Sequence, residues 1–235
     1  MSGTDAAARR AVLARSPLFQ AMQPAEMEAV VAQATVKRVP RGAVLLRRGA
    51  ESPGAFVVMQ GQVRIATTAE DGREVTLGVL GPGDVIGEMS LIDGEPVSAD
   101  ATALDACVLM AIERGRFLRQ LRTSPDLCLR LMAVLTRRLR RSNAALEEMA
   151  LLPLPVRLGR VLLRLAKDYG APVPGGTRIE VRLSQKDLAA IAGASREKVN
   201  RQLRLWEDAG AIGHDTGRIT VLRPEVLEEL PEEKT

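Results

Sequence analysis

One predicted helix gathers, on a single face, side chains that could hydrogen-bond to the edges of DNA bases. The helix is predicted from Arg196 to about Trp206, and its apolar face repeats at four- and three-residue steps: Val199, Leu203 and Trp206. Its other face carries Arg196, Glu197, Asn200, Arg201 and Arg204. Arginine can pair bidentately with guanine, and glutamate can accept from the cytosine amino group. The pattern favours a major-groove reader over the plainer alternative, a surface ion pair between Glu197 and Arg201.

A shorter helix and a tight turn are predicted directly before this helix. Ser184 suits the N-cap of a helix from Gln185 to about Ile191, and Gly193 suits a left-handed stop, after which Ser195 caps the next helix. We add Ser184, Gln185 and Ser195 to the candidate DNA contacts. A hairpin predicted over residues 213–221 would form a β-wing, so the segment reads as a winged helix-turn-helix.

The surroundings of this motif are basic and are set off from the rest of the chain by prolines. Residues 153–223 hold 13 Lys and Arg against 7 Asp and Glu, which favours a polyanionic partner. Pro153 and Pro155 interrupt the preceding helical pattern, because proline cannot donate the backbone hydrogen bond that a helix needs. A helix over residues 156–169 and a loop over residues 172–176 are predicted next.

The N-terminal half has the pattern of an antiparallel β-structure. From Thr35 to about Ile112, short apolar runs alternate with glycines, and Asp71-Gly72 is suited to a hairpin turn. Two short helices are predicted before it, over residues 6–13 and 24–32. We therefore expect an α+β chain with an N-terminal β jelly-roll.

A long helix is predicted between the two halves, from Pro125 to about Leu152. Its apolar positions follow a coiled-coil seam, from which we assign a dimer interface to Met132, Leu135, Leu139, Leu146 and Met149. A second stripe, formed by Leu127, Leu131 and Val134, is expected to pack against the β-domain. The alternative is one intramolecular core helix. Ser142 interrupts the seam with a polar residue, and Asn143 follows it.

Other function classes lack the residues that they need. The two cysteines, Cys107 and Cys128, form no CxxC motif, and His214 is the one histidine. We therefore expect no metal site, no structural disulfide and no enzyme activity. Apolar runs are too short for a membrane span, and the N-terminus lacks the order of a signal peptide, so a cytoplasmic protein is expected.

The order of these parts resembles the Crp/Fnr family of bacterial transcription regulators over nearly the whole chain. Three stretches carry the resemblance most specifically: residues 81–91, GPGDVIGEMSL; residues 183–189, LSQKDLA; and residues 195–201, SREKVNR. The resemblance implies a homodimer that reads a TGTGA-like inverted repeat, with Arg196 and Arg201 on guanines and Glu197 on cytosine. It also implies RNA polymerase as a partner, beside double-stranded DNA.

The resemblance also places an effector site in the β-domain. It assigns this site to Gly87, Glu88, Met89, Ser90, Val97, Ser98, Ser142 and Asn143, with Glu88 on the ribose hydroxyl of a cyclic nucleotide. The family pattern has an arginine for the cyclic phosphate where this chain has Val97, and losing such a partner costs about 2–5 kcal/mol. Response to cyclic AMP is therefore in doubt.

Three hypotheses for the effector remain open. The site could take another ligand such as a cyclic dinucleotide, it could take none in a constitutive regulator, or it could hold cyclic AMP by an unusual phosphate contact. A protein-interaction module on a cyclic-nucleotide fold is a further alternative to DNA reading. The family's iron–sulfur and heme sensors lack their ligands here. The predicted division is a sensor domain over residues 1–123, a dimerisation helix over 124–152 and a DNA-binding domain over 153–235.

Overall fold

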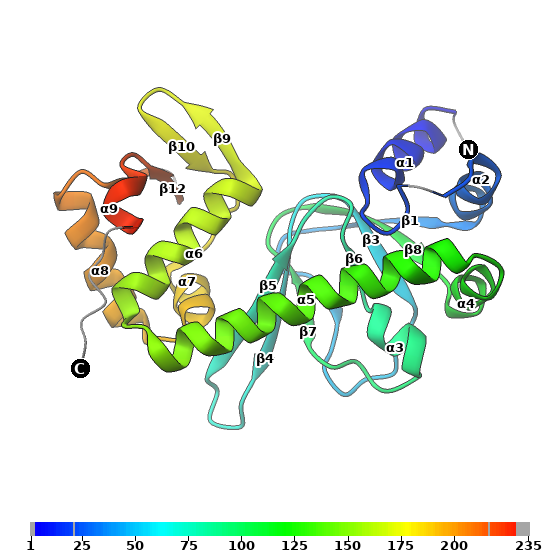
Figure 1. Ribbon diagram of the computed structural model, residues 1–235, viewed down its shortest axis with the longest axis horizontal. Coiled ribbons are helices and arrows are strands. Elements are labelled where there is room, and N and C mark those ends of the chain that lie inside the picture. The colour runs from blue at the N-terminus through cyan, green and yellow to red at the C-terminus, as the bar shows by residue number, and fades with distance from the viewer. Residues whose placement is uncertain (1–2, 21, 216, 229–235) are drawn as a thin grey trace. The chain divides into compact units, whose positions relative to one another are not determined.

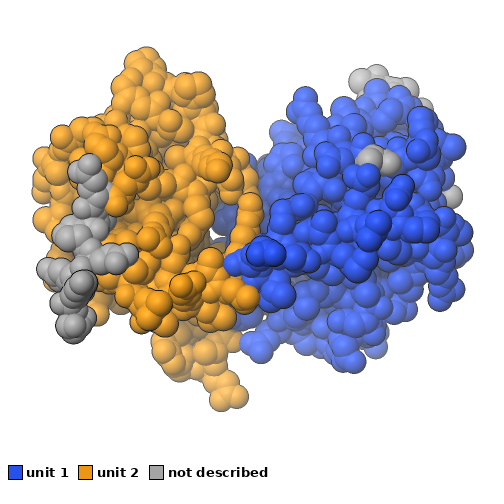
Figure 2. Space-filling model, viewed as in Figure 1, with its two compact units in different colours: residues 1–67, 77–140 blue, residues 68–76, 141–235 orange. Residues whose placement is uncertain are grey.

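The computed structural model describes residues 3–20, 22–215 and 217–228. Contacts divide the chain into two compact units, coloured separately in Figure 2. Unit 1 comprises Met1–Thr67 and Leu77–Arg140, and unit 2 comprises Thr68–Thr76 and Arg141–Thr235. This division by contacts falls inside the long helix. The predicted boundaries at residues 123/124 and 152/153 separate functions and not contacts, and they stay a prediction.

Two four-stranded antiparallel sheets, with strand orders β1-β8-β3-β6 and β2-β7-β4-β5, form unit 1 apart from the end of the β4–β5 hairpin, which is counted with unit 2 (Figure 1). This arrangement matches the expected jelly-roll. The strands are β1 (Thr35–Val39), β2 (Val44–Leu46), β3 (Ala55–Gln60), β4 (Val63–Thr68), β5 (Glu74–Leu80), β6 (Val85–Ile86), β7 (Asp100–Ala103) and β8 (Cys107–Ile112). The predicted turn at Asp71-Gly72 joins β4 to β5, where the Ala69 amide donates to the Arg73 carbonyl at 2.8 Å.

The central strands of the first sheet, β3 and β8, are apolar on both faces, because they lie between two cores. One face and the second sheet enclose Phe56, Val58 and Leu109. The other face, with Val57 and Met110, packs against helices. These helices are α1 (Gly3–Arg15), α2 (Pro24–Gln33), α4 (Arg114–Thr123) and α5 (Pro125–Leu151), while the short α3 (Glu88–Asp93) follows β6.

One of the two apolar stripes of the long helix α5 packs against the β-domain as predicted. Leu127 and Leu131 are buried in the core of unit 1, with Val134 packed against it, because these residues recur on one side of the helix. Met132, Leu139 and Leu146 on the other side are exposed. The helix therefore presents an uncovered apolar face in the single chain.

Unit 2 packs helices on one side of a small sheet with strand order β11-β12-β10-β9. Its elements are α6 (Leu154–Tyr169), β9 (Gly170–Val173), β10 (Gly176–Ile179), α7 (Gln185–Ala192), α8 (Arg196–Asp208), β11 (Ile212–Asp215), β12 (Arg218–Val221) and α9 (Pro224–Glu228). Helix α6 contacts α7, α8 and α9 and supplies buried Leu158 and Leu162 to the core.

The loop predicted over residues 172–176 is correct at residues 174–175, which form the turn of a hairpin, but residues 172, 173 and 176 belong to its strands β9 and β10. Pro172 lies within β9, although proline in a sequence weakens a strand assignment. It is tolerated here because β9 is the edge strand, where a missing amide hydrogen leaves no neighbouring strand unpaired. The predicted wing is present as the pair β11 and β12.

Candidate DNA interface and effector pocket

The turn between α7 and α8 is fixed by caps at both helices. The Ser184 hydroxyl accepts from the Asp187 amide at 3.1 Å, and the Asp187 carboxylate accepts from the Ser184 amide at 2.9 Å, so the start of α7 is closed reciprocally. Gly193 ends α7 with φ near 62°, a left-handed conformation that suits glycine. The Ser195 hydroxyl then accepts from the Lys198 amide at 3.4 Å and caps α8.

Helix α8 separates an apolar back from a polar front. Val199, Leu203 and Trp206 are buried in unit 2. Arg196, Glu197, Arg201 and Arg204 are exposed, and Asn200 is half-buried. Within the described part of the chain, no ion pair joins Glu197 to Arg201. The plainer alternative for these two side chains is therefore not what the structure contains.

One hydrogen bond connects the two helices of the motif on this front. The Gln185 side-chain amide donates to the Asn200 side-chain carbonyl at 2.9 Å. The structure thus brings two predicted DNA contacts from α7 and α8 together. Each amide keeps unused hydrogen-bonding capacity, because an amide group has two donor hydrogens and two acceptor lone pairs.

The predicted effector cassette begins at Gly87, between β6 and α3. Gly87 has φ near 81°, and a Cβ there would lie 3.1 Å from both the Gly54 carbonyl oxygen and Leu46 Cδ1. A larger residue would disturb this turn. Glu88 follows as the first residue of α3, and its side chain is only 5% exposed.

Glu88 is already neutralised by a residue that the sequence analysis did not name. The guanidinium of Arg138, on α5, donates to the Glu88 carboxylate and also to the Val85 carbonyl at 2.6 Å. A buried carboxylate needs such a partner. Arg138 lies one helical turn before Ser142, and this spacing is the signal that could have identified it.

Val97 is part of the hydrophobic core. It is 5% exposed and packs with Leu46, Phe56 and Ile86 between the two sheets. A side chain in this position offers no charge to a cyclic phosphate. Ser98 is exposed beside it, with its hydroxyl 3.8 Å from the sulfur of Met89. The two positions that the resemblance assigns to the ribose and the phosphate of a cyclic nucleotide differ in chemistry. Glu88 is charged and paired, whereas Val97 is apolar.

The remaining effector residues lie in different environments. Ser90 is buried on α3, and Met89 is exposed. Ser142 and Asn143 are exposed on the part of α5 that belongs to unit 2. Their role at the effector site stays a prediction.

The five predicted seam residues are not equally exposed. Met132, Leu139 and Leu146 are 54%, 61% and 66% exposed. Leu135 instead packs partly against the core of unit 1. A Cβ on Gly193 would lie 3.2 Å from Met149 Cε, so Met149 lies against the turn between α7 and α8. The open part of the seam is thus formed by Met132, Leu139 and Leu146, which lie seven residues apart.

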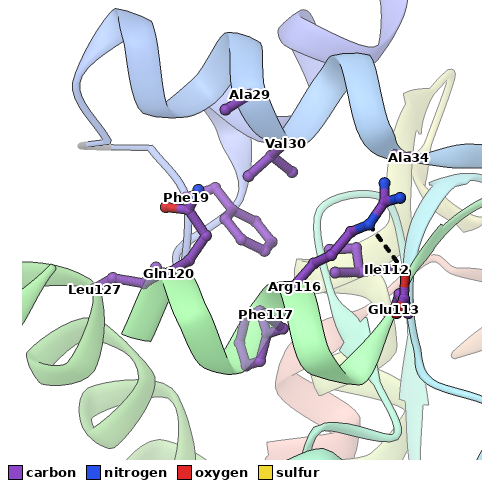
Figure 3. Close-up of a pocket in the computed structure, with 10 residues that line it drawn as sticks. All are labelled: Phe19, Ala29, Val30, Ala34, Ile112, Glu113, Arg116, Phe117, Gln120 and Leu127. Atoms are coloured by element: carbon purple, nitrogen blue, oxygen red, sulfur yellow. Dashed lines mark ion pairs between the residues drawn. The ribbon is translucent and has the colours of Figure 1, made fainter. Parts of the chain in front are cut away.

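A separate apolar pocket lies between α2, α4 and α5 (Figure 3). Phe19, Val30, Phe117 and Leu127 line it, and the ion pair between Glu113 and Arg116, at 2.9 Å, lies at its side. None of the predicted effector residues lines this pocket.

Two negative findings concern the described residues alone. Across residues 3–20, 22–215 and 217–228, His, Cys, Asp and Glu side chains form no cluster of three that could hold a metal ion. Over the same ranges, no helix combines the length and apolarity of a membrane span.

Burial raises the pKa of the Cys107 thiol, which lies in the core of unit 1.

Family models match both halves of the chain. Residues 36–124 match a cyclic nucleotide-binding domain, and residues 156–230 match a Crp-like helix-turn-helix domain. A CRP-like cAMP-activated global transcriptional regulator of Mycobacterium tuberculosis is 33% identical over 201 residues, covering 86% of this chain and 90% of that protein. A cyclic AMP receptor protein of Thermus thermophilus is 32% identical over 215 residues, covering 92% and 96%.

A solved structure shows the same architecture. It is described as the c-di-GMP responsive global regulator CLP of Xanthomonas campestris, with a TM-score of 0.74 and 26% identity, covering 85% of this chain and 99% of that one. The fold is that of transcription regulators and not of enzymes. The jelly-roll, the long helix and the capped helix-turn-helix agree with these matches, and the chain belongs to the Crp/Fnr family of transcription regulators.

Proposed function

We propose that the chain is a homodimeric transcription regulator that reads a TGTGA-like inverted repeat in double-stranded DNA. The observation that carries this proposal is the front of α8, where Arg196, Glu197 and Arg201 are exposed while the back of the helix is buried. Arg196 and Arg201 would pair with guanines, and Glu197 would accept from cytosine. Ser184, Gln185, Ser195, Asn200 and Arg204 would complete the contacts to bases and phosphates.

The dimer would form through the exposed face of α5. Two copies related by a twofold axis bury the same face against each other, so Met132, Leu139 and Leu146 would meet their counterparts. A twofold dimer presents two α8 helices to two half-sites, which makes an inverted repeat the matching target. As a regulator of this family, the dimer would act through RNA polymerase.

All three hypotheses for the effector stay in the proposal. The structure supports the expectation that cyclic AMP, if it binds, binds weakly. Val97 is buried and apolar, and Glu88 is held by Arg138. A cyclic phosphate would meet no arginine at position 97. The relatives are described as cAMP-activated and as c-di-GMP responsive, so both chemistries are candidates beside a ligand-independent regulator.

Fluorescence anisotropy tests the function directly. A labelled TGTGA-type inverted repeat and a scrambled duplex are titrated at several salt concentrations. We expect preference for the repeat and affinity that falls steeply with salt, because each neutralised phosphate releases counterions. Equal binding to both duplexes would contradict sequence reading, and no binding would favour the protein-interaction module.

The same assay separates the effector hypotheses. Cyclic AMP, cyclic GMP and cyclic di-GMP are added one at a time to the complex. Tight binding without any nucleotide and no response to all three supports a constitutive regulator. A change with one of them identifies the effector, and a response to micromolar cyclic AMP would show that another group replaces the missing arginine.

A further inference from the structure

The end of α5 is joined to α6 by a charged cluster. Glu148 accepts from Arg164 at 2.9 and 3.1 Å, and Arg160 lies 3.6 Å from the same carboxylate. The Glu148 side chain is only 13% exposed, although other side chains near the end of α5 are open to solvent. Charge-assisted bonds to a shielded carboxylate are stronger than ordinary surface ion pairs.

Arg157 adds a second connection at the same place. Its guanidinium donates to the Leu152 carbonyl at 2.7 Å, to the Ala192 carbonyl at 3.1 Å and to the Gly193 carbonyl at 3.4 Å. One side chain at the start of α6 therefore holds both the last turn of α5 and the turn between α7 and α8. Figure 1 shows α6 folding back beside the end of α5, with α7 next to it.

Met149 completes the contact from the α5 side. Its side chain lies against Gly193, where a Cβ would come within 3.2 to 3.5 Å of three Met149 atoms. Glu148, Met149, Arg157 and Arg164 together form what we call the α5–α6 clamp. The clamp belongs wholly to unit 2, and the prolines at 153 and 155 lie within its span.

The clamp is adjacent in sequence to the proposed dimer seam. Leu146 precedes Glu148 by two residues, and it is 66% exposed on the other side of the helix. One helical turn therefore carries a seam residue and the attachment of the helix-turn-helix. A group fixed to that turn keeps a constant position relative to the twofold axis of a dimer.

We propose that Glu148 is a positioning residue for DNA reading: it holds the helix-turn-helix rigidly on the end of α5, so that the pairing of α5 helices sets the spacing of the two half-sites. This inference rests on the proposed function. Pro153 and Pro155 interrupt the helix, but the junction between α5 and α6 stays rigid, because Glu148 and Arg157 each make contacts across it. Glu147, exposed and outside the clamp, serves as the matched control.

Hydrogen exchange tests the clamp without DNA. In the full-length dimer, E148Q keeps the side-chain volume and removes the charge. We expect exchange of the Leu152 and Arg157 amides, which donate to the Glu148 and Pro153 carbonyls, to rise about three- to tenfold relative to E147Q, a range that allows for the half-exposed arginines. Equal exchange in E148Q and E147Q would overturn the clamp.

A series of DNA duplexes tests the spacing. The inverted repeat is prepared with one or two base pairs inserted or removed between its half-sites. We expect wild type and E147Q to lose affinity sharply when the spacing changes, while E148Q and R164Q lose about three- to tenfold less. The double variant E148Q/R164Q should behave like E148Q, because E148Q already removes the ion pairs of Glu148 with both Arg164 and Arg160.

Two controls separate positioning from general damage. Light scattering should give a dimer for E148Q, and the order of preference among half-site base changes should match wild type. An E148Q protein with the wild-type spacing penalty would overturn the proposal. A wild-type protein that prefers no inverted repeat would instead refute the proposed function, and hydrogen exchange would then decide the clamp alone.

Discussion

The front of α8 and the cassette at Glu88 both contain an arginine and a glutamate, yet they use them in opposite ways. On α8, Arg196, Glu197 and Arg201 are exposed, and Glu197 makes no ion pair with Arg201 within the described chain. In the cassette, Glu88 is buried and paired with Arg138. The first set of charges is available to an external partner, and the second is satisfied inside the protein.

Residue type alone therefore does not identify a binding site. An exposed charged side chain is solvated by water and needs no partner within the protein, so it stays available to an external partner. A buried carboxylate must be paired within the protein, because an unpaired buried charge is strongly destabilising. Arg138 donates to one oxygen of the Glu88 carboxylate, so this charge is balanced before any ligand arrives.

The largest effect on DNA binding is expected from a change in the dimer seam, which leaves the side chains of the α8 front unaltered. Leu139→Lys places a charge on the exposed seam, where it would be buried between two helices. We expect a monomer by light scattering and specific DNA affinity lower by about two decades or more, because the second half-site no longer binds intramolecularly. Leu139→Met is the control. A dimeric Lys variant would show that another face forms the interface.

The cassette is tested by Arg138→Met, which leaves Glu88 charged and buried. We expect unfolding by denaturant to show a loss of about 3 kcal/mol, and the double variant with Glu88→Gln to recover most of it. Arg137→Met, at an exposed neighbouring position, should have little effect. DNA base preference should not change. A stable Arg138→Met protein would mean that the ion pair contributes little.

The α8 front is tested by Arg196→Ala, which removes one proposed guanine contact. Specific affinity should fall by about 1–3 kcal/mol, with discrimination relaxed at one base pair. Arg196→Lys keeps the charge and loses the bidentate geometry, so it should lose discrimination with a smaller loss of overall affinity. Anisotropy on single-base variants of the half-site measures both. Unchanged discrimination would remove Arg196 from the readers.

The smallest effect is expected from the hydrogen bond between Gln185 and Asn200. Replacing either residue with Ala should weaken specific binding by about 1 kcal/mol, since the partner amide loses its orientation. A double-mutant cycle should give a coupling of about 0.5–1 kcal/mol. Strictly additive losses would mean that the two amides contact DNA independently.

Much of the fold could be predicted because the determining signals are local. Ser184, Gly193 and Ser195 act on the nearest turns of backbone, and each lies where the sequence places it. The two apolar stripes of α5 follow from helical periodicity alone. The hairpin of β9 and β10 was missed because Pro172 is acceptable only at a sheet edge, and edge position depends on the order of all strands.

Helix periodicity, caps and residue identity are properties of neighbouring positions, so the sequence was enough to predict the architecture, the residues of the α8 front and the absence of an arginine at position 97. The folded chain was needed to show that Arg138 neutralises Glu88, that Met149 lies against Gly193 and that Glu148 joins α5 to α6. These contacts join residues as much as 50 positions apart, and burial selects them by the cost of leaving charge or apolar surface without a partner.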